Sequence, residues 1–122
     1  MVAVTPFGPV GRVHRVLGAA ASIILLTDIN SSVAVRLQTT RVSGILEGRG
    51  DGTCSMKYVS KDTEVNVGDE IVTSGLDGIF PEELFVGYVS EVIPEDGEMF
   101  QIIRVVPAQN LNAIEEVVIL RR

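Results

Sequence analysis

Short apolar runs, each ended by a cluster of turn-forming residues, recur along the whole chain. The clearest lie in three strings, LLTDINSSVAVRLQ at 25–38, GILEGRGDG at 44–52 and DEIVTSGLDGIFPEELFVGYVSEV at 69–92. In each string a β-branched or aliphatic run is interrupted by Gly, Asn, Asp or Pro, which is the pattern of strand, tight turn and strand. Such signals recur about every 8–12 residues, as is typical of a small barrel or sandwich. We therefore predict an all-β fold.

The composition agrees with a fold of strands. Of the 122 residues, 46% are hydrophobic, but there is no Trp and there are only four Phe and two Tyr. The core must therefore be built mainly from Val, Ile and Leu, and β-branched side chains pack well on a pleated sheet. A chain of this length buries roughly two-thirds of the surface that its unfolded state exposes. Neither a metal ion nor a disulfide is required for stability.

The charges are unevenly distributed between the two halves. Residues 1–61 hold seven Lys or Arg against three acids, whereas residues 62–122 hold thirteen acids against three arginines, and the whole chain carries a net charge of −6. An acidic chain repels the phosphate backbone, so we predict no nucleic-acid binding. A basic half and an acidic half can dock head to tail in a homo-oligomer or filament. The alternative is that both are simply solvated surfaces.

Few residues offer metal or cofactor chemistry. A single cysteine, Cys54, and a single histidine, His14, cannot supply a zinc site, and we predict that Cys54 is a small buried side chain. No cofactor site is expected. The longest apolar string, GAAASIILL at 18–26, is far shorter than the ~20 residues that span a bilayer, and we predict a buried strand there. Met1 directly before a strand-like VAV suggests a start inside a longer protein.

The residues alone raise two functional alternatives, a serine hydrolase and a small ligand-binding barrel. His14, Asp28 and Ser74 occur in the chain order of a chymotrypsin-type serine hydrolase. The string TSG at 73–75 lacks the Gly-x-Ser-Gly context that would form an oxyanion hole, so we predict no catalytic residues. The second alternative is a small ligand-binding barrel, although the interior of so small a barrel is normally filled by side chains.

The richest candidate for partner binding is FPEELFVGYV at 80–89. It brings Phe80, Leu84, Phe85 and Tyr88 close together in the sequence. The odd spacing of Phe85 and Tyr88 predicts that they lie on opposite sides of a strand, with at least one of them facing outward. Exposed aromatic side chains often anchor interfaces. The alternative is ordinary core filling by three of the four.

Glycine and proline mark the predicted turns and hairpins. FVGYVSEVI at 85–93 and MFQIIRVVP at 99–107 predict a hairpin joined by PEDGE. Glycine supplies positive φ angles and proline fixes φ, so these residues are predicted at structural turns. They are Gly44, Gly48, Gly75, Gly78 and Pro81.

Several strings, in this order, resemble the bacterial rod-shape-determining family MreC over nearly the whole chain. The most specific are TSGLDGIFP at 73–81 and GILEG at 44–48. The others are VGRV ending at Val13, LLTD followed by NSSV at 25–33, the spaced pattern from KYV to VGD at 57–69, FQ to PA at 100–108, and IEEV with IL at 114–120.

The resemblance implies a fold of two small six-stranded-type barrels, arranged topologically as in chymotrypsin but without its catalytic centre. Residues 33–106 would form the second barrel, and residues 1–32 and 107–122 would contribute strands of an incomplete first barrel. It also implies a non-enzymatic scaffold for cell-wall elongation that maintains rod shape.

The resemblance further implies several partners and a cellular location. The expected partners are copies of the chain itself and the class B penicillin-binding protein, together with MreD, RodA and the MreB machinery. The expected location is the periplasm or its extracytoplasmic equivalent. A membrane helix and coiled coil outside this sequence would anchor the β domain.

Overall fold

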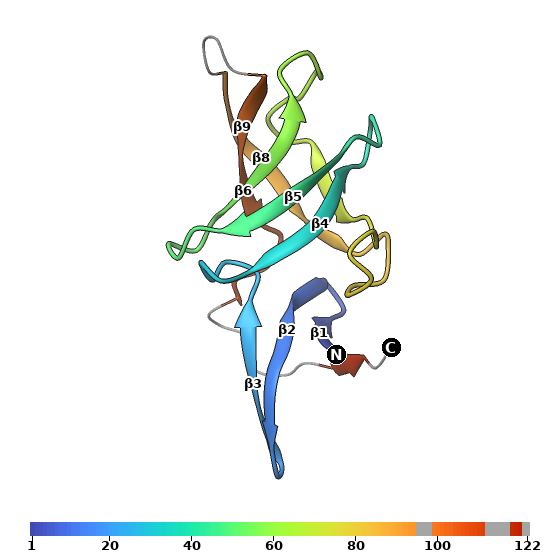
Figure 1. Ribbon diagram of the computed structural model, residues 1–122, viewed down its shortest axis with the longest axis vertical. Helices are drawn as coiled ribbons and strands as arrows, with labels where there is room; N and C mark the ends of the chain where they lie inside the picture. The colour runs from blue at the N-terminus through green and yellow to red at the C-terminus, as the bar shows by residue number, and fades with distance from the viewer. Residues whose placement is uncertain (95–98, 112–117, 121–122) are drawn as a thin grey trace.

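The computed structural model describes residues 1–94, 99–111 and 118–120, and it confirms the all-β prediction. Ten short strands account for the regular structure of this part of the chain, and Figure 1 shows their arrangement. They are β1 (Val2–Thr5), β2 (Gly8–Leu17), β3 (Ala20–Leu25), β4 (Ser32–Leu37), β5 (Ser43–Gly48), β6 (Cys54–Ser60), β7 (Glu70–Thr73), β8 (Phe85–Ile93), β9 (Phe100–Pro107) and β10 (Val118–Leu120).

Six strands close into a barrel in the order β4-β5-β6-β9-β8-β7. Every neighbouring pair is antiparallel, and the barrel closes where Val35 pairs with Thr73 and Leu37 pairs with Ile71. Closure gives each of the six strands a partner on both sides, which removes the exposed edges that favour aggregation. The prediction of a six-stranded-type barrel is confirmed.

The other four strands form an open sheet in the order β10-β1-β2-β3. Figure 1 shows that the long hairpin of β2 and β3 extends away from the barrel along the longest axis of the molecule. Its outer half is exposed, which corrects the prediction that 18–26 is a buried strand: residues 18–22 are exposed and only Leu26 is fully buried. The assignment of this sheet to an incomplete first barrel stays a prediction.

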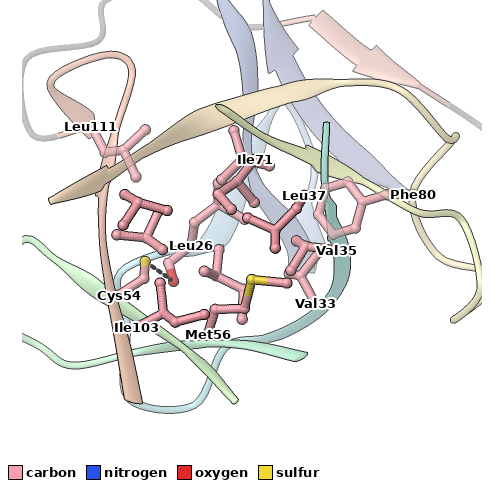
Figure 2. Close-up of a cluster of buried hydrophobic side chains, with 14 of the residues drawn as sticks. Leu26, Val33, Val35, Leu37, Cys54, Met56, Ile71, Phe80, Ile103 and Leu111 are labelled. Carbon is pink, nitrogen blue, oxygen red and sulfur yellow. Dashed lines mark hydrogen bonds between the residues drawn. The ribbon is translucent and has the colours of Figure 1, made fainter. Parts of the chain in front are cut away.

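One hydrophobic core runs through the barrel and continues into the sheet. Inside the barrel, inward-facing side chains from alternate strand positions fill the interior, among them Leu37, Met56 and Ile103 (Figure 2). Val2 and Val10 extend the same cluster into β1 and β2. The sheet is therefore joined to the barrel by packing as well as by the chain.

Two of the five predicted turn residues are strand residues instead. Gly44 and Gly48 lie within β5. A Cβ at Gly48 would collide with the carbonyl oxygen of Asp28, and one at Gly44 would press on Lys57 and Met56. Glycine is needed at both positions because backbone approaches closely, which is a use of glycine that sequence does not separate from turn formation.

Gly75, Gly78 and Pro81 all lie in the loop that joins β7 to β8. Gly75 has φ +74° and Gly78 has φ +70°, the left-handed conformation that glycine adopts most readily. Asp77 organises the same loop, since its carboxylate accepts hydrogen bonds from the backbone N–H of Ala34 at 2.9 Å and of Ile79 at 3.0 Å.

Candidate functional site at the junction of sheet and barrel

A groove of about 500 Å³ lies where the turn between β1 and β2 meets the start of β8. We call it the junction groove. One wall is the backbone turn from Val4 to Gly8, and the other runs from Glu83 to Phe85 and on to Tyr88. Two elements far apart in sequence therefore build one concave surface.

Close backbone packing holds the two walls together. A Cβ at Gly8 would collide with the carbonyl oxygen of Phe85, and Gly8 has φ +139°, so only glycine allows this approach without strain. The Gln109 side chain ties the β1–β2 turn to the chain after β9. Its Nε2 donates to the carbonyl oxygen of Gly8 at 3.2 Å, and the Thr5 hydroxyl donates to its Oε1 at 2.7 Å.

Phe85 and Tyr88 both line the groove and contact each other edge to face, with ring centroids 5.1 Å apart. This corrects the prediction that they lie on opposite sides of β8. The register between β7 and β8 shifts between Ile71, which pairs with Gly87, and Val72, which pairs with Phe85. This β-bulge adds one residue to β8 and reverses the alternation of sides.

The remaining two candidates take different positions. Phe80 is 1% exposed and packs in the barrel core, whereas Leu84 is half-buried and lines the groove. Phe7, which no sequence pattern singles out, is 71% exposed at the tip of the β1–β2 turn and contributes to the same groove. Phe7 and Phe85 are 78 positions apart, so no local sequence pattern indicates that they line the same groove.

Charged side chains fix the rim of the groove at Glu83. The Arg36 guanidinium donates a hydrogen bond to the Glu83 carboxylate, and Arg41 lies 3.0 Å from the same oxygen. Glu83 and Arg41 both have positive φ, at +68° and +65°, which is uncommon for residues other than glycine. The ion pairs connect these two strained turns, one before β5 and one before β8.

A second group of exposed apolar side chains lies elsewhere, on β6 and at the start of β9. Tyr58, Met99 and Phe100 are 59%, 73% and 43% exposed, and we call them the distal patch. The rings of Tyr58 and Phe100 meet edge to face with centroids 5.8 Å apart. The sequence does not single them out, because each lies in a stretch with the ordinary alternation of a strand.

The three residues of the hydrolase alternative are not brought together. Ser74 is buried beside the barrel strand β4, where its N–H donates to the carbonyl oxygen of Ala34. His14 is exposed on the outer half of β2, in the other sheet. The Asp28 carboxylate accepts a hydrogen bond from the N–H of Asn30 at 2.7 Å. A nucleophile, its base and the orienting acid must be within hydrogen-bond reach, and these three occupy separate sites.

Other chemistry finds little support in the described residues. Among them, no three His, Cys, Asp or Glu side chains are grouped so as to hold a metal ion, and no helix is long and apolar enough to cross a membrane. Burial, with a smaller contribution from Asp51, raises the pKa of the Cys54 thiol to about 12. That thiol is protonated at neutral pH and donates to the carbonyl oxygen of Leu26, so it is not a nucleophile.

Comparison with known proteins decides the family. The model of the rod shape-determining protein MreC, barrel core, matches residues 1–121. The chain belongs to the MreC family. This match confirms the family resemblance seen in the sequence. The relatives are named as cell shape-determining proteins and not for a reaction, which agrees with the prediction that the chain is not an enzyme.

Curated relatives from several bacteria are cell shape-determining proteins MreC. That of Cereibacter sphaeroides is 36% identical over 84 residues, which cover 69% of this chain and 28% of the relative. That of Listeria monocytogenes is 28% identical over 127 residues, which cover the whole chain and 43% of the relative. The chain thus spans less than half the length of these MreC relatives.

Solved structures of MreC share the fold. The crystal structure of MreC from Pseudomonas aeruginosa superposes with a TM-score of 0.92 at 31% identity, over 95% of this chain and 76% of that one. MreC from Helicobacter pylori, solved in a complex with a penicillin-binding protein, gives 0.72 at 23% identity over 90% and 71%. The major periplasmic domain of the cell shape-determining filament MreC gives 0.73 at 19% over 88% and 68%.

Proposed function

We propose that the chain is a non-enzymatic scaffold of the bacterial cell-wall elongation machinery and helps to maintain rod shape. The match of the MreC model over residues 1–121 carries this proposal. The filled barrel supports it against the ligand-binding alternative, because core side chains occupy the barrel interior. The separation of His14 from Ser74 supports it against the hydrolase.

The proposed partner is a class B penicillin-binding protein, and the proposed binding surface is the junction groove. A similarly folded MreC was solved with a penicillin-binding protein, which supports this class of partner. The groove offers Phe7 and Tyr88, at 71% and 41% exposed, over a wall of half-buried Phe85 and Leu84. Interfaces concentrate their binding energy on such aromatic anchors in concave, partly apolar sites.

The wider assembly follows from the family. We propose self-association, in keeping with the solved filament-forming relative, and cooperation with MreD, RodA and MreB. The proposed location is extracytoplasmic, with a membrane helix and coiled coil in the part of the longer protein outside this sequence. In that longer protein the open sheet β10-β1-β2-β3 would be part of a first barrel.

Binding of the purified extracytoplasmic domain of a class B penicillin-binding protein tests the proposal. The dissociation constant, measured by isothermal titration calorimetry, should rise about tenfold or more for Tyr88→Ala and for Phe7→Ala, which remove the two exposed anchors. Ile29→Ala is the matched control, since Ile29 is equally exposed at 71% but lies outside the groove. Unchanged affinity in both groove variants would contradict the groove, and no binding by the wild type would contradict the partner.

A further inference from the structure

The outer half of the β2–β3 hairpin is a two-stranded ribbon exposed on both faces. Val16 pairs with Ala21 and Leu17 pairs with Ala20, and every residue from 14 to 22 is exposed. Val16 is 52% exposed and Leu17 is 68% exposed. An isolated two-stranded hairpin is marginally stable in water, so an apolar one that extends from the body gains from a partner.

The ribbon is also basic. Arg12 and Arg15 are exposed on β2, the first acid in the chain is Asp28, and residues 16–27 carry no charge. We call residues 15–22 the hairpin tip. It combines a small apolar surface with positive charge, so it suits a partner that is apolar at the centre and acidic around it.

The distal patch has those properties. Its apolar centre is the edge-to-face pair of Tyr58 and Phe100 with exposed Met99. The chain after β6 is held beside it, since the Lys61 N–H donates to the carbonyl oxygen of Met99 at 3.0 Å. That chain exposes Asp62 and Glu64 together with Lys61. Lys57, next to Tyr58, is also exposed, and Glu47 compensates its charge at 2.8 Å.

The backbone at Tyr58 is unusual in a way that matters for the patch. Tyr58 has φ +68°, and the register between β6 and β9 shifts between Met56 and Val59. Such a β-bulge re-aims a side chain, and a positive φ costs an aromatic residue conformational energy. Neighbouring Val59 remains fully buried in the core. The bulge therefore holds a large aromatic ring in solvent while the core next to it stays intact.

The two surfaces lie at opposite ends of the molecule. Figure 1 places the β2–β3 tip at one end of the longest axis, and the end of β6 and the start of β9 at the other end. A tip therefore cannot reach the distal patch of its own chain. It can reach only the patch of another copy.

We propose that the hairpin tip of one copy docks on the distal patch of the next. Leu17 packs on Tyr58 and Phe100, and Arg15, which lies on the same face of β2, faces the acidic side chains beside the patch. The contact joins two different surfaces at opposite ends, so it does not close on itself and extends copies into a filament. This inference rests on the proposed self-association. It names the two surfaces that form the contact, and neither of them is the junction groove.

A second copy explains more of the structure than an anionic bilayer does. A bilayer would account for the basic, apolar tip, but it would leave the exposed Tyr58 ring and its strained backbone without a role. Docking on a second copy accounts for both ends with one contact. The test must therefore distinguish binding to vesicles from self-association.

Two variants that each remove one surface test the inference by sedimentation velocity over a concentration series. Leu17→Asp places an acid at the tip, and Tyr58→Asn removes the ring with a residue that tolerates positive φ. The wild type should grow in mass with concentration, and each variant alone should associate at least about tenfold more weakly. An equimolar mixture should form a heterodimer and stop there, because each variant keeps the surface that the other lacks. Higher salt should weaken the wild-type association.

The contrary outcomes are equally definite. Assembly of Tyr58→Asn like the wild type, with loss in Leu17→Asp alone, would mean pairing of tip with tip and would overturn the inference. So would a monomeric wild type, or binding of the wild type but not Leu17→Asp to anionic vesicles without self-association. Ile29→Asp, at an exposed site outside both surfaces, should behave like the wild type, and circular dichroism melts establish that all variants fold. Binding of the penicillin-binding protein, measured on the same samples, reports separately on the proposed function.

Discussion

At the scale of single residues, Cys54 shows how burial sets chemistry. Its side chain is 1% exposed in the core, its thiol donates to the carbonyl oxygen of Leu26 at 3.4 Å, and burial raises its pKa from 9.0 to about 12. The folded protein therefore holds this proton at pH values where the unfolded chain has released it. Stability from this group is fully present below pH 9 and is lost as the pH rises from 9 towards 12.

We predict that Cys54→Ala flattens this alkaline loss. Urea unfolding at pH 8, 9, 10 and 11 should show the free energy of unfolding falling more steeply for the wild type than for Cys54→Ala, although the variant is less stable at pH 8 because it loses packing volume. Every other titratable group is common to both proteins, so the difference between the two curves isolates the thiol. Parallel curves would show that Cys54 keeps an ordinary pKa in the fold.

The presence of a glycine does not by itself reveal why the fold requires one at that position. Gly75 and Gly78 lie in the loop after β7 with positive φ, as a turn residue does, whereas Gly48 lies in β5 against the carbonyl of Asp28. The sequence predicts that glycine is required at such positions. Whether a positive φ or a close approach imposes it depends on a segment that is distant in sequence, as the turn at Asp28 is from Gly48.

At the scale of elements, the ion pairs of Glu83 connect two loops. Arg36 is only 12% exposed and its Nε is buried without a hydrogen-bond partner, so its charge depends on the carboxylates of Glu83 and, at 3.7 Å, of Glu82. By contrast, Lys57 and Glu47 pair across β5 and β6 at 2.8 Å with both side chains more than a third exposed. A half-buried pair and a solvated pair therefore occur in one barrel.

We predict that Glu83→Gln lowers the free energy of unfolding by about 1–2 kcal/mol, because it leaves the half-buried Arg36 charge poorly compensated. The matched change Glu47→Gln should cost less than about 0.5 kcal/mol, as is usual for exposed pairs. Urea denaturation of both variants measures the difference. Equal costs in the two variants would mean that the Glu83 ion pairs are only surface contacts.

The sequence predicts the bounds of the strands well. It predicts poorly on which side of a strand a given side chain projects. The prediction of a strand at 85–93 matches β8 residue for residue, because an aliphatic run between turn signals defines its ends. The side on which Tyr88 projects was predicted wrongly, since a bulge opposite β7 reverses the alternation. Tyr58 lies beside another such bulge, against β9. Both bulges depend on pairing partners that local sequence does not specify.

At the scale of the whole molecule, the sequence predicts a barrel but not the surfaces between its parts. The alternation of apolar residues requires a closed or layered sheet, and the family resemblance gives the topology. The junction groove arises only when the β1–β2 turn with Phe7 meets β8, and the hairpin tip is exposed because it extends beyond Gly8–Arg12, the part of β2 that pairs with β1. Each depends on contacts between segments far apart in the chain.

The same architecture divides the molecule into regions of unequal stability. Barrel strands have partners on both sides and side chains in a continuous core, whereas residues 14–22 of the hairpin are exposed on both faces. Amides open at a free energy that follows local burial and pairing, up to the global value. At low protein concentration, hydrogen exchange should therefore be slowest in β4, β6 and β9 and much faster in the hairpin tip.

We predict that raising the protein concentration slows exchange in the hairpin tip and in residues 57–61 together, because docking of one copy on the next covers both surfaces. Mass-spectrometric exchange at two concentrations measures this, and Leu17→Asp should abolish the slowing in both segments. The turn at Ile29, exposed but outside both surfaces, should exchange at one rate throughout. Slowing of the tip without slowing at Tyr58 would mean that tips pair with each other, in which case the assembly closes as a dimer and cannot extend.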